Sequence, residues 1–207
     1  MRAGFYPIVL LSGLLCLPAA VFAAAPCERL VASADMQSPP YLWPDPQRPG
    51  KFLGAHVDLV KQLSSELQLP IKLLDSGSWF AAQQDVQSGR VDLLLGAFLD
   101  LPGNQQFDYL PPATWPVHLM PANADSLATL VPAGQLDSAP VSQQSPAQFL
   151  ALGKNSACNT PLLRGQLSKK LAELRASGLL DSLLQTNLRL WQTQQQRALP
   201  VLDAPNP

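Results

Sequence analysis

The chain has 207 residues, of which 47% are hydrophobic and 14% are charged, and its formal net charge is −1. This composition can bury a core, so it excludes a disordered chain, and the near-neutral charge excludes a strongly basic nucleic-acid-binding surface. The 21 prolines predict stiff loops between short elements.

The first 23 residues predict a cleavable secretory signal peptide. Arg2 supplies a positive start, residues 8–21 are almost wholly apolar, and Val21-Phe22-Ala23 has the small residues expected before a cleavage site. The alternative is an N-terminal membrane anchor, but the apolar run is shorter than the roughly 20 residues that a bilayer needs. We therefore expect cleavage after Ala23 and a periplasmic mature protein.

Two cysteines, Cys27 and Cys158, remain after cleavage. An even pair in an oxidising compartment predicts a disulfide, the alternatives being two free thiols or pairing with another chain. We expect no metal and no cofactor, because only His56 and His118 could join the cysteines and no ligand spacing is present.

Residues 29–95 predict a strand, a helix, a strand, a helix and a strand in close order. The strands are expected at 29–34, 71–74 and 91–95, and the helices at 54–67 and 79–88, with an extended loop over 35–50 that carries five prolines. Ser78 can cap the second helix, and Gly89 can end it. This order predicts an α/β fold in which helices flank a parallel-rich sheet.

Beyond residue 95 the pattern is looser until two leucine-rich stripes predict C-terminal helices. Residues 96–112 are rich in loop formers, and we expect strands at 117–120, 135–141 and 148–152 and a short helix at 125–131. The stripes run from Leu163 to Leu174 and from Leu180 to Trp191, and Gly178 separates them. Residues 193–207 are rich in Gln and Pro and are expected to be a disordered tail.

Several landmarks, taken as an ordered set, resemble the family 3 extracellular solute-binding proteins. They are Pro39-Pro40-Tyr41, Gly54 with Asp58, Trp79, Gly89-Arg90-Val91-Asp92, Gly96 and Phe107-Asp108-Tyr109. The resemblance implies a periplasmic-binding-protein-like fold, in which two α/β lobes close on a ligand held in the cleft between them. It also implies that Asp58 and Asp92 are structural residues of the helix opening and the strand start.

The sequence departs from this family in two ways. In the family, an Arg of the first lobe grips the α-carboxylate of the ligand, but Gly103 stands at that position here, and residues 91–153 contain no Arg or Lys. The second lobe is also shortened. We expect lobe 1 over 24–113, a reduced lobe 2 over 114–160, C-terminal helices over 161–192 and the tail over 193–207.

Six residues are candidates for ligand contacts: Asp35, Tyr41, Trp43, Trp79, Phe98 and Asp100. Aromatic faces hold flat or cationic groups. Asp35 follows the first strand and Asp100 is expected at the mouth of the cleft on the opposite edge, so the set suits a cationic or neutral ligand. Trp79 can instead be a core residue, and the two acids can be solvated loop residues.

We therefore expect an exported receptor that binds a small polar molecule, such as an amino acid or a related amine or organic solute. It would be a monomer that serves ABC-type uptake through an inner-membrane permease. The alternative is a periplasmic protein-interaction module that kept the fold and lost the ligand site. We expect no enzyme, because no nucleophile elbow, phosphate loop or zinc-spaced histidine pair is present.

Overall fold

The computed structural model describes residues 27–99, 103–119, 130–132 and 147–198. The expected signal peptide therefore lies outside the described residues, and so does Asp100. Within these ranges, none of the helices combines the length and the apolar character needed to cross a bilayer.

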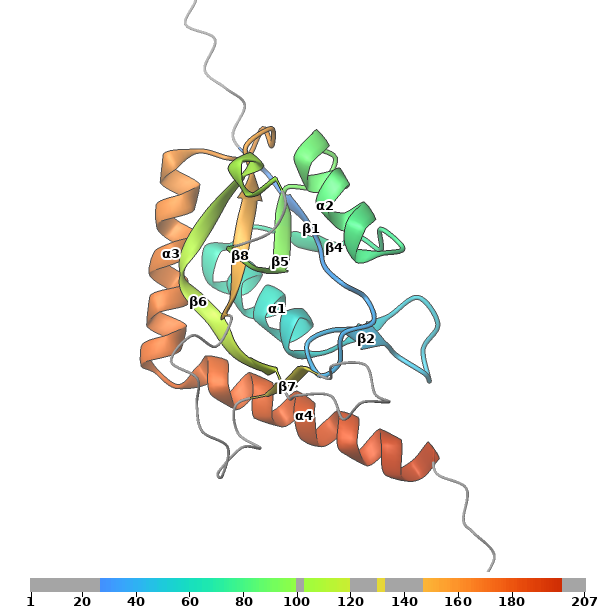
Figure 1. Ribbon diagram of the computed structural model, residues 1–207. Coiled ribbons are helices and arrows are strands. Elements are labelled where there is room, and N and C mark those ends of the chain that lie inside the picture. Colours follow the sequence, from blue (N-terminus) through green and yellow to red (C-terminus); the bar gives the residue numbers. More distant parts are fainter. Residues whose placement is uncertain (1–26, 100–102, 120–129, 133–146, 199–207) are drawn as a thin grey trace, which may run out of the picture.

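Among the described residues, six strands form one sheet in the order β4-β1-β5-β8-β6-β7 (Figure 1). The strands are β1 (Leu30–Ser33), β4 (Ile71–Leu73), β5 (Leu93–Ala97), β6 (Phe107–Leu119), β7 (Leu130–Pro132) and β8 (Ala147–Gly153). Strand β1 is parallel to both β4 and β5, as the β-α-β-α-β order predicted. Strand β8 runs antiparallel between β5 and β6, and β7 is antiparallel to β6. The strands β2 (Trp43–Pro44) and β3 (Phe52–Leu53) form a separate small antiparallel pair.

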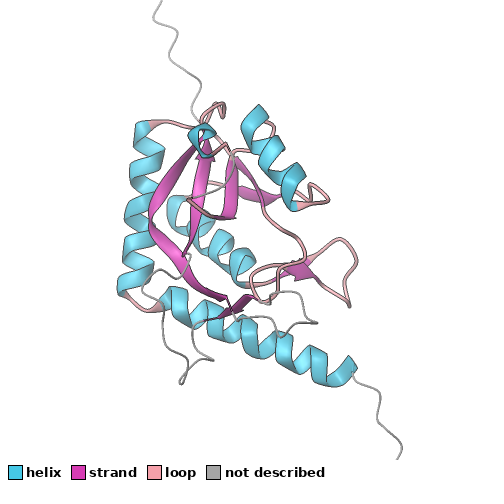
Figure 2. Cartoon of the chain, viewed as in Figure 1, coloured by secondary structure: helices cyan, strands magenta, loops and turns pink. Residues whose placement is uncertain are grey.

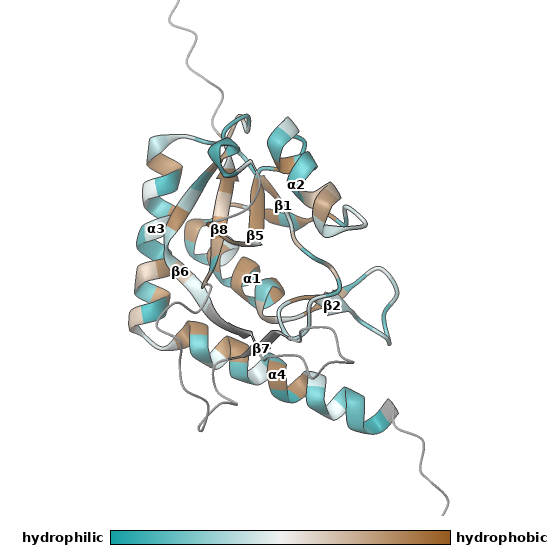
Figure 3. Cartoon of the chain, viewed as in Figure 1, coloured by the Kyte–Doolittle hydropathy of each residue, from teal (hydrophilic) through white to brown (hydrophobic). Residues whose placement is uncertain are grey.

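The helices are α1 (Ala55–Leu67), α2 (Trp79–Ser88), α3 (Pro161–Ala176) and α4 (Leu179–Ala198), with a 3₁₀ turn η1 (Asn104–Gln106) before β6. They cover both faces of the sheet (Figure 2). Residues 93–95 of β5 show this division, because successive side chains of a strand point to opposite faces. Leu93 and Leu95 pack with residues of α1, α3 and α4, whereas Leu94 packs with α2. Ala97 also packs with α2, because the strand register shifts between Leu95 and Ala97. Consistent with burial on both faces, the central strands β5 and β8 are mostly apolar (Figure 3).

The structure confirms the helices expected at 54–67 and 79–88 and the two C-terminal helices, but it changes several boundaries. Strand β5 lies two residues later than expected, and β6 begins at Phe107 within a stretch expected to be loop-rich. Of the helix expected over 125–131, Leu130 and Val131 belong to β7, and the rest lies outside the described residues. The strand expected over 135–141 lies outside them as well.

The C-terminal part of the sheet bears on the expected division into lobes. Strand β8 lies between β5 and β6, so residues 147–153, which were expected in the reduced second lobe, are part of the main sheet. Of the range 114–160 that was expected to form the reduced second lobe, residues 120–129 and 133–146 lie outside the described residues. Helix α4 continues to Ala198, six residues into the segment for which a disordered tail was expected.

Candidate functional site

A hollow of about 210 Å³ lies where β1 and β5 end. The residues that line it are Asp35, Ser38, His56, Trp79, Leu95, Gly96, Phe98 and Gln148. Carboxyl-terminal strand ends are where open α/β sheets generally bind ligands. The volume is below the range of about 300–1,000 Å³ that is usual for drug-sized ligands, so the hollow suits a small solute.

Three of the six expected ligand residues, Asp35, Trp79 and Phe98, line this hollow. Each is half-buried. Asp35 follows β1, and its Oδ1 accepts a hydrogen bond of 3.0 Å from the backbone N–H of Gln37. Phe98 follows β5, and its carbonyl accepts a 2.8 Å hydrogen bond from the hydroxyl of Tyr109. Both loops are thus fixed by hydrogen bonds at the strand ends.

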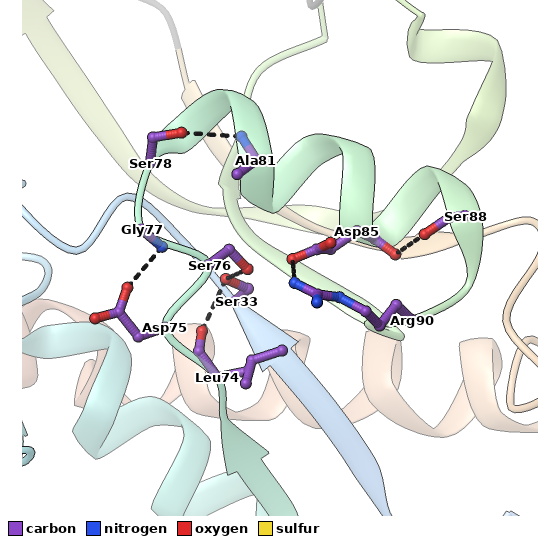
Figure 4. Close-up of polar contacts among 10 residues, drawn as sticks. All are labelled: Ser33, Leu74, Asp75, Ser76, Gly77, Ser78, Ala81, Asp85, Ser88 and Arg90. Atoms are coloured by element: carbon purple, nitrogen blue, oxygen red, sulfur yellow. Dashed lines mark hydrogen bonds and ion pairs between the residues drawn. The ribbon is translucent and has the colours of Figure 1, made fainter.

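The turn between β4 and α2, shown in Figure 4, directly precedes Trp79. Ser78 caps the helix, since its Oγ accepts a 3.1 Å hydrogen bond from the N–H of Ala81. Asp75 Oδ1 accepts from the N–H of Gly77 at 2.7 Å, and the hydroxyls of Ser33 and Ser76 lie 3.0 Å apart. The turn is therefore tied to β1, and Trp79 is the first residue of α2.

The other end of α2 is held by an ion pair between Asp85 and Arg90 (Figure 4). The hydrogen bond from Arg90 holds the pKa of the Asp85 carboxyl below its ordinary value. Gly89 ends the helix in the left-handed conformation, so that the chain turns back toward β5. Arg90 belongs to the Gly89–Asp92 motif, and its role here is structural.

Tyr41 and Trp43 do not line the hollow, because the proline-rich loop folds back onto α1 and α4. The carbonyls of Pro40 and Tyr41 accept the N–H groups of Ala55 and His56 at 3.1 and 2.9 Å, which satisfies two free donors at the start of α1. Tyr41 is fully buried, and burial raises its pKa to about 12. Trp43 is also buried, and its ring packs against Trp191 of α4.

Gly54 makes this close approach of the loop to α1 possible. A Cβ atom at this position would lie 2.2 Å from the carbonyl oxygen of Tyr41, and the φ angle of +132° is one that other residues rarely adopt. The close packing of the loop against α1 therefore explains the glycine at position 54.

Four lining residues besides Gly96 were not identified from the sequence: Ser38, His56, Leu95 and Gln148. His56 enters from the first turn of α1, and Gln148 enters from β8. Each is 3% exposed. Burial lowers the pKa of His56 to about 3, so its imidazole is neutral at physiological pH. Nothing in the local sequence around either residue distinguishes it from an ordinary core or surface position.

Among the described residues, those that line the hollow include no lysine or arginine. Gly103, expected at the position of the family's carboxylate-gripping Arg, is exposed and precedes η1. The residues just before it in the sequence, Asp100, Leu101 and Pro102, are not basic either. The charge of this site therefore comes from Asp35, and a ligand carboxylate would find no cationic partner among the lining residues.

Asp58 and Asp92 have structural partners, as the resemblance implied. The two oxygens of Asp92 accept the N–H of Val31 at 2.8 Å and the hydroxyl of Ser156 at 2.6 Å. Asp58 accepts a 2.9 Å hydrogen bond from Asn187, which joins α1 to α4.

Cys27 and Cys158 are bonded to each other, with an S–S distance of 2.06 Å and Cα atoms 5.1 Å apart. The disulfide ties the residues before β1 to the loop before α3. In the part of the chain that the structure describes, no three His, Cys, Asp or Glu side chains gather as metal ligands.

The profile of one protein family, the bacterial extracellular solute-binding proteins of family 3, matches residues 30–189. The chain belongs to this family. The match spans all described strands and most of α4, so the resemblance inferred from the landmarks is confirmed. No curated protein matches the sequence.

Solved structures with the same fold are distant in sequence from this family member. The second substrate-binding domain of a putative amino acid ABC transporter from Streptococcus pneumoniae has 14% identity and a TM-score of 0.61, and the match covers 77% of this chain and all of that one. An amino acid ABC transporter substrate-binding protein from the same species, bound to L-arginine, has 15% identity and a TM-score of 0.60, with 78% and 95% covered. An ancestral cyclohexadienyl dehydratase has 11% identity and a TM-score of 0.57, with 78% and 93% covered. At these identities the likeness shows the fold alone.

Proposed function

We propose that this family member is an exported receptor that binds a small polar molecule, an amino acid or a related amine or organic solute, in the hollow at the ends of β1 and β5. The observation that carries the proposal is the convergence of Asp35, Trp79 and Phe98 on that hollow. A concave site with apolar walls and a few converging polar groups is the usual form of a small-molecule site.

The proposed role is uptake through an inner-membrane ABC permease, with the receptor acting in the periplasm as a monomer. Two of the similar structures are substrate-binding parts of amino acid ABC transporters, which supports this role. The ligands of those two proteins are not assigned to this chain, because Gly103 is expected at the position of the residue that grips an amino acid carboxylate.

A thermal-shift screen of the exported protein against amino acids, polyamines and small organic acids tests the proposal. A ligand at about 100 times its Kd should stabilise the folded protein by about 2.7 kcal/mol. Trp79→Ala should abolish that shift, whereas Phe80→Ala, which changes the exposed neighbouring residue, should keep it. If no solute in these classes shifts the transition, the receptor proposal fails.

A second function, a protein-interaction module, is favoured by two exposed apolar side chains. Phe80 is 68% exposed and Leu99 is 55% exposed, and each follows directly a residue that lines the hollow. Exposed apolar groups can mark a docking surface for another periplasmic protein. A pull-down in which a double Phe80→Ser and Leu99→Ser variant loses a partner retained by the unmodified protein would support this function over solute binding.

We propose binding rather than catalysis as the activity of the site. The lining residues include one carboxylate, Asp35, and one imidazole, His56, whose pKa of about 3 is far below the value that suits a general base at neutral pH. The dehydratase among the similar structures shares the fold at 11% identity and does not by itself argue for enzymatic activity here.

A further inference from the structure

Among the described residues, three buried side-chain atoms have no hydrogen-bond partner: Oη of Tyr41, Nδ1 of His56 and Oε1 of Gln148. Tyr41 does not line the hollow, but His56 and Gln148 do. Both residues are only 3% exposed, and both line the hollow. Buried polar groups in folded proteins are nearly always paired, so two unpaired groups at a cavity wall indicate a partner that comes from outside the protein.

The two side chains converge beneath Gly96. A Cβ atom placed on Gly96 would lie 3.1 Å from Nε2 of His56 and 3.6 Å from Oε1 of Gln148. Gly96 also lines the hollow, so the absence of a side chain at this point of β5 leaves Oε1 of Gln148 and the Nε2 edge of the His56 ring close to it. An alanine there would fill the approach to them.

The His56 ring is held between aromatic neighbours. It lies 5.8 Å from the ring of Tyr41 and 5.2 Å from that of Trp115, measured between centroids. Such packing pre-organises the imidazole, since little side-chain freedom is left to lose when a ligand arrives. The backbone of Gln148 is held as well, because its carbonyl accepts a 3.0 Å hydrogen bond from the hydroxyl of Thr114.

The chemistry of the unpaired atoms selects the kind of partner. Oε1 of Gln148 can only accept a hydrogen bond, so its partner must donate one. The uncharged imidazole of His56 can donate one bond and accept another. Asp35 adds a carboxylate to the same hollow, and none of the lining residues that the structure describes is cationic. A carboxylate, which only accepts, could pair with Gln148 only after the amide turned its NH₂ group toward the ligand, and it would still face Asp35.

We infer that His56 and Gln148 are specificity-determining residues that bind a nitrogen head group with N–H donors, an amide or an amidinium, and discriminate against a carboxylate. The inference deepens the proposed solute-binding function and depends on it. Trp79 and Phe98 would lie against the apolar part of such a ligand.

Three ring compounds that differ in the head group alone provide the test: benzamide, benzamidine and benzoate. Binding to the exported protein is measured by NMR titration, with the indole N–H signals as the readout. We expect benzamide and benzamidine to bind and benzoate to bind at least 10-fold more weakly. Equal or stronger binding of benzoate would overturn the inference and leave the proposed small-molecule site standing.

Variants of Gln148 separate a ligand-binding role from a structural one. Gln148→Met removes the acceptor at similar side-chain length and should weaken the binding of benzamide at least 10-fold. Gln87 lies outside the hollow, so Gln87→Met should leave the binding of benzamide unchanged. Gln148→Glu keeps an acceptor and adds charge, so it should raise the preference for benzamidine over benzamide by about 10-fold. A residue that only supports the fold would not move this ratio, and an unchanged ratio in a folded Gln148→Glu protein would refute the role.

His56→Phe keeps an aromatic ring in the same place but removes both ring nitrogens, so it should weaken the binding of benzamide several-fold. If none of the three probes binds the unmodified protein, the inference is wrong. The separate screen against amino acids, polyamines and organic acids then decides whether the broader receptor proposal also fails.

Discussion

The indole Nε1 of Trp43 donates a 2.9 Å hydrogen bond to Oε1 of Gln194, 151 residues further along the chain. The Trp43 ring also meets Trp191 edge-on, with centroids 5.5 Å apart. These contacts join the proline-rich loop to the last turns of α4. Helix α4 is therefore a structural support for the loop that leads into α1, and Trp43 provides the contacts between the two.

Removal of the Gln194 acceptor should destabilise the protein. Gln194→Ala leaves the buried Trp43 N–H without its partner, which should lower the free energy of unfolding by about 1–3 kcal/mol. The neighbouring Gln195 is exposed, so Gln195→Ala should stay within about 0.5 kcal/mol of the unmodified protein. Urea unfolding measures both values. Similar effects of the two substitutions would show that α4 is not anchored through Trp43.

The glycine at position 54 should be far less replaceable than the one at position 50. In Gly54→Ala the new Cβ would meet backbone atoms of Tyr41 at 2.2 and 2.6 Å, so overpacking adds to backbone strain, and we expect a loss of about 2–4 kcal/mol. Gly50 also has a positive φ, +76°, but a Cβ atom on it would meet no other atom within 4 Å. Gly50→Ala should therefore lose only about 1 kcal/mol, from strain alone. Chemical unfolding of the two variants tests the difference, and equal losses would contradict the close-packing argument.

The sequence predicted the β-α-β-α-β half of the fold because its signals are local. Apolar periodicity, the Ser78 cap and the Gly89 stop fix α1 and α2 within a few residues, and the parallel order of β1, β4 and β5 follows from chain connectivity. The antiparallel insertion of β8 between β5 and β6 could not be predicted in the same way. It depends on pairing between distant segments, for which a short apolar run carries no directional signal.

The candidate site shows the same difference between local signals and contacts of distant segments. Asp35, Trp79 and Phe98 lie directly at element ends, where this architecture presents side chains to a cleft, and the structure brings them together. Tyr41 and Trp43 occupy a loop whose burial depends on contacts with α1 and α4, which no local pattern reveals. His56 and Gln148 reach the hollow from α1 and from β8, so their convergence exists only in the folded sheet.

The Cys27–Cys158 disulfide should stabilise the folded protein through its effect on the unfolded chain. A closed loop of this length corresponds to roughly 4–5 kcal/mol of chain entropy, so Cys27→Ser with Cys158→Ser should lower the free energy of unfolding by up to that amount. Thiol labelling of unreduced, denatured protein should find neither cysteine free. Two labelled thiols in protein recovered from the periplasm would dismiss the bridge.

The buried His56 should make the protein less stable in acid. Its pKa is about 3 in the folded protein and about 6.5 when unfolded, so the unfolded state binds the proton first as the pH falls. The stabilising effect of a neutral buried imidazole is thus fully present above about pH 6.5 and is lost progressively as the pH drops toward 3. The expected slope is up to about 1.4 kcal/mol per pH unit within that window.

A comparison with His56→Phe isolates this contribution, because carboxylates such as Asp85 also lose stabilising contacts in acid and do so in both proteins. The free energy of unfolding, measured by urea at pH 7, 6, 5 and 4, should fall more steeply for the unmodified protein than for the variant. The difference between the two curves should change mainly below pH 6.5 and be flat above it. Parallel curves from pH 7 to 4 would mean that the imidazole can be protonated in the folded state, and that a proton can reach the floor of the hollow without unfolding the sheet.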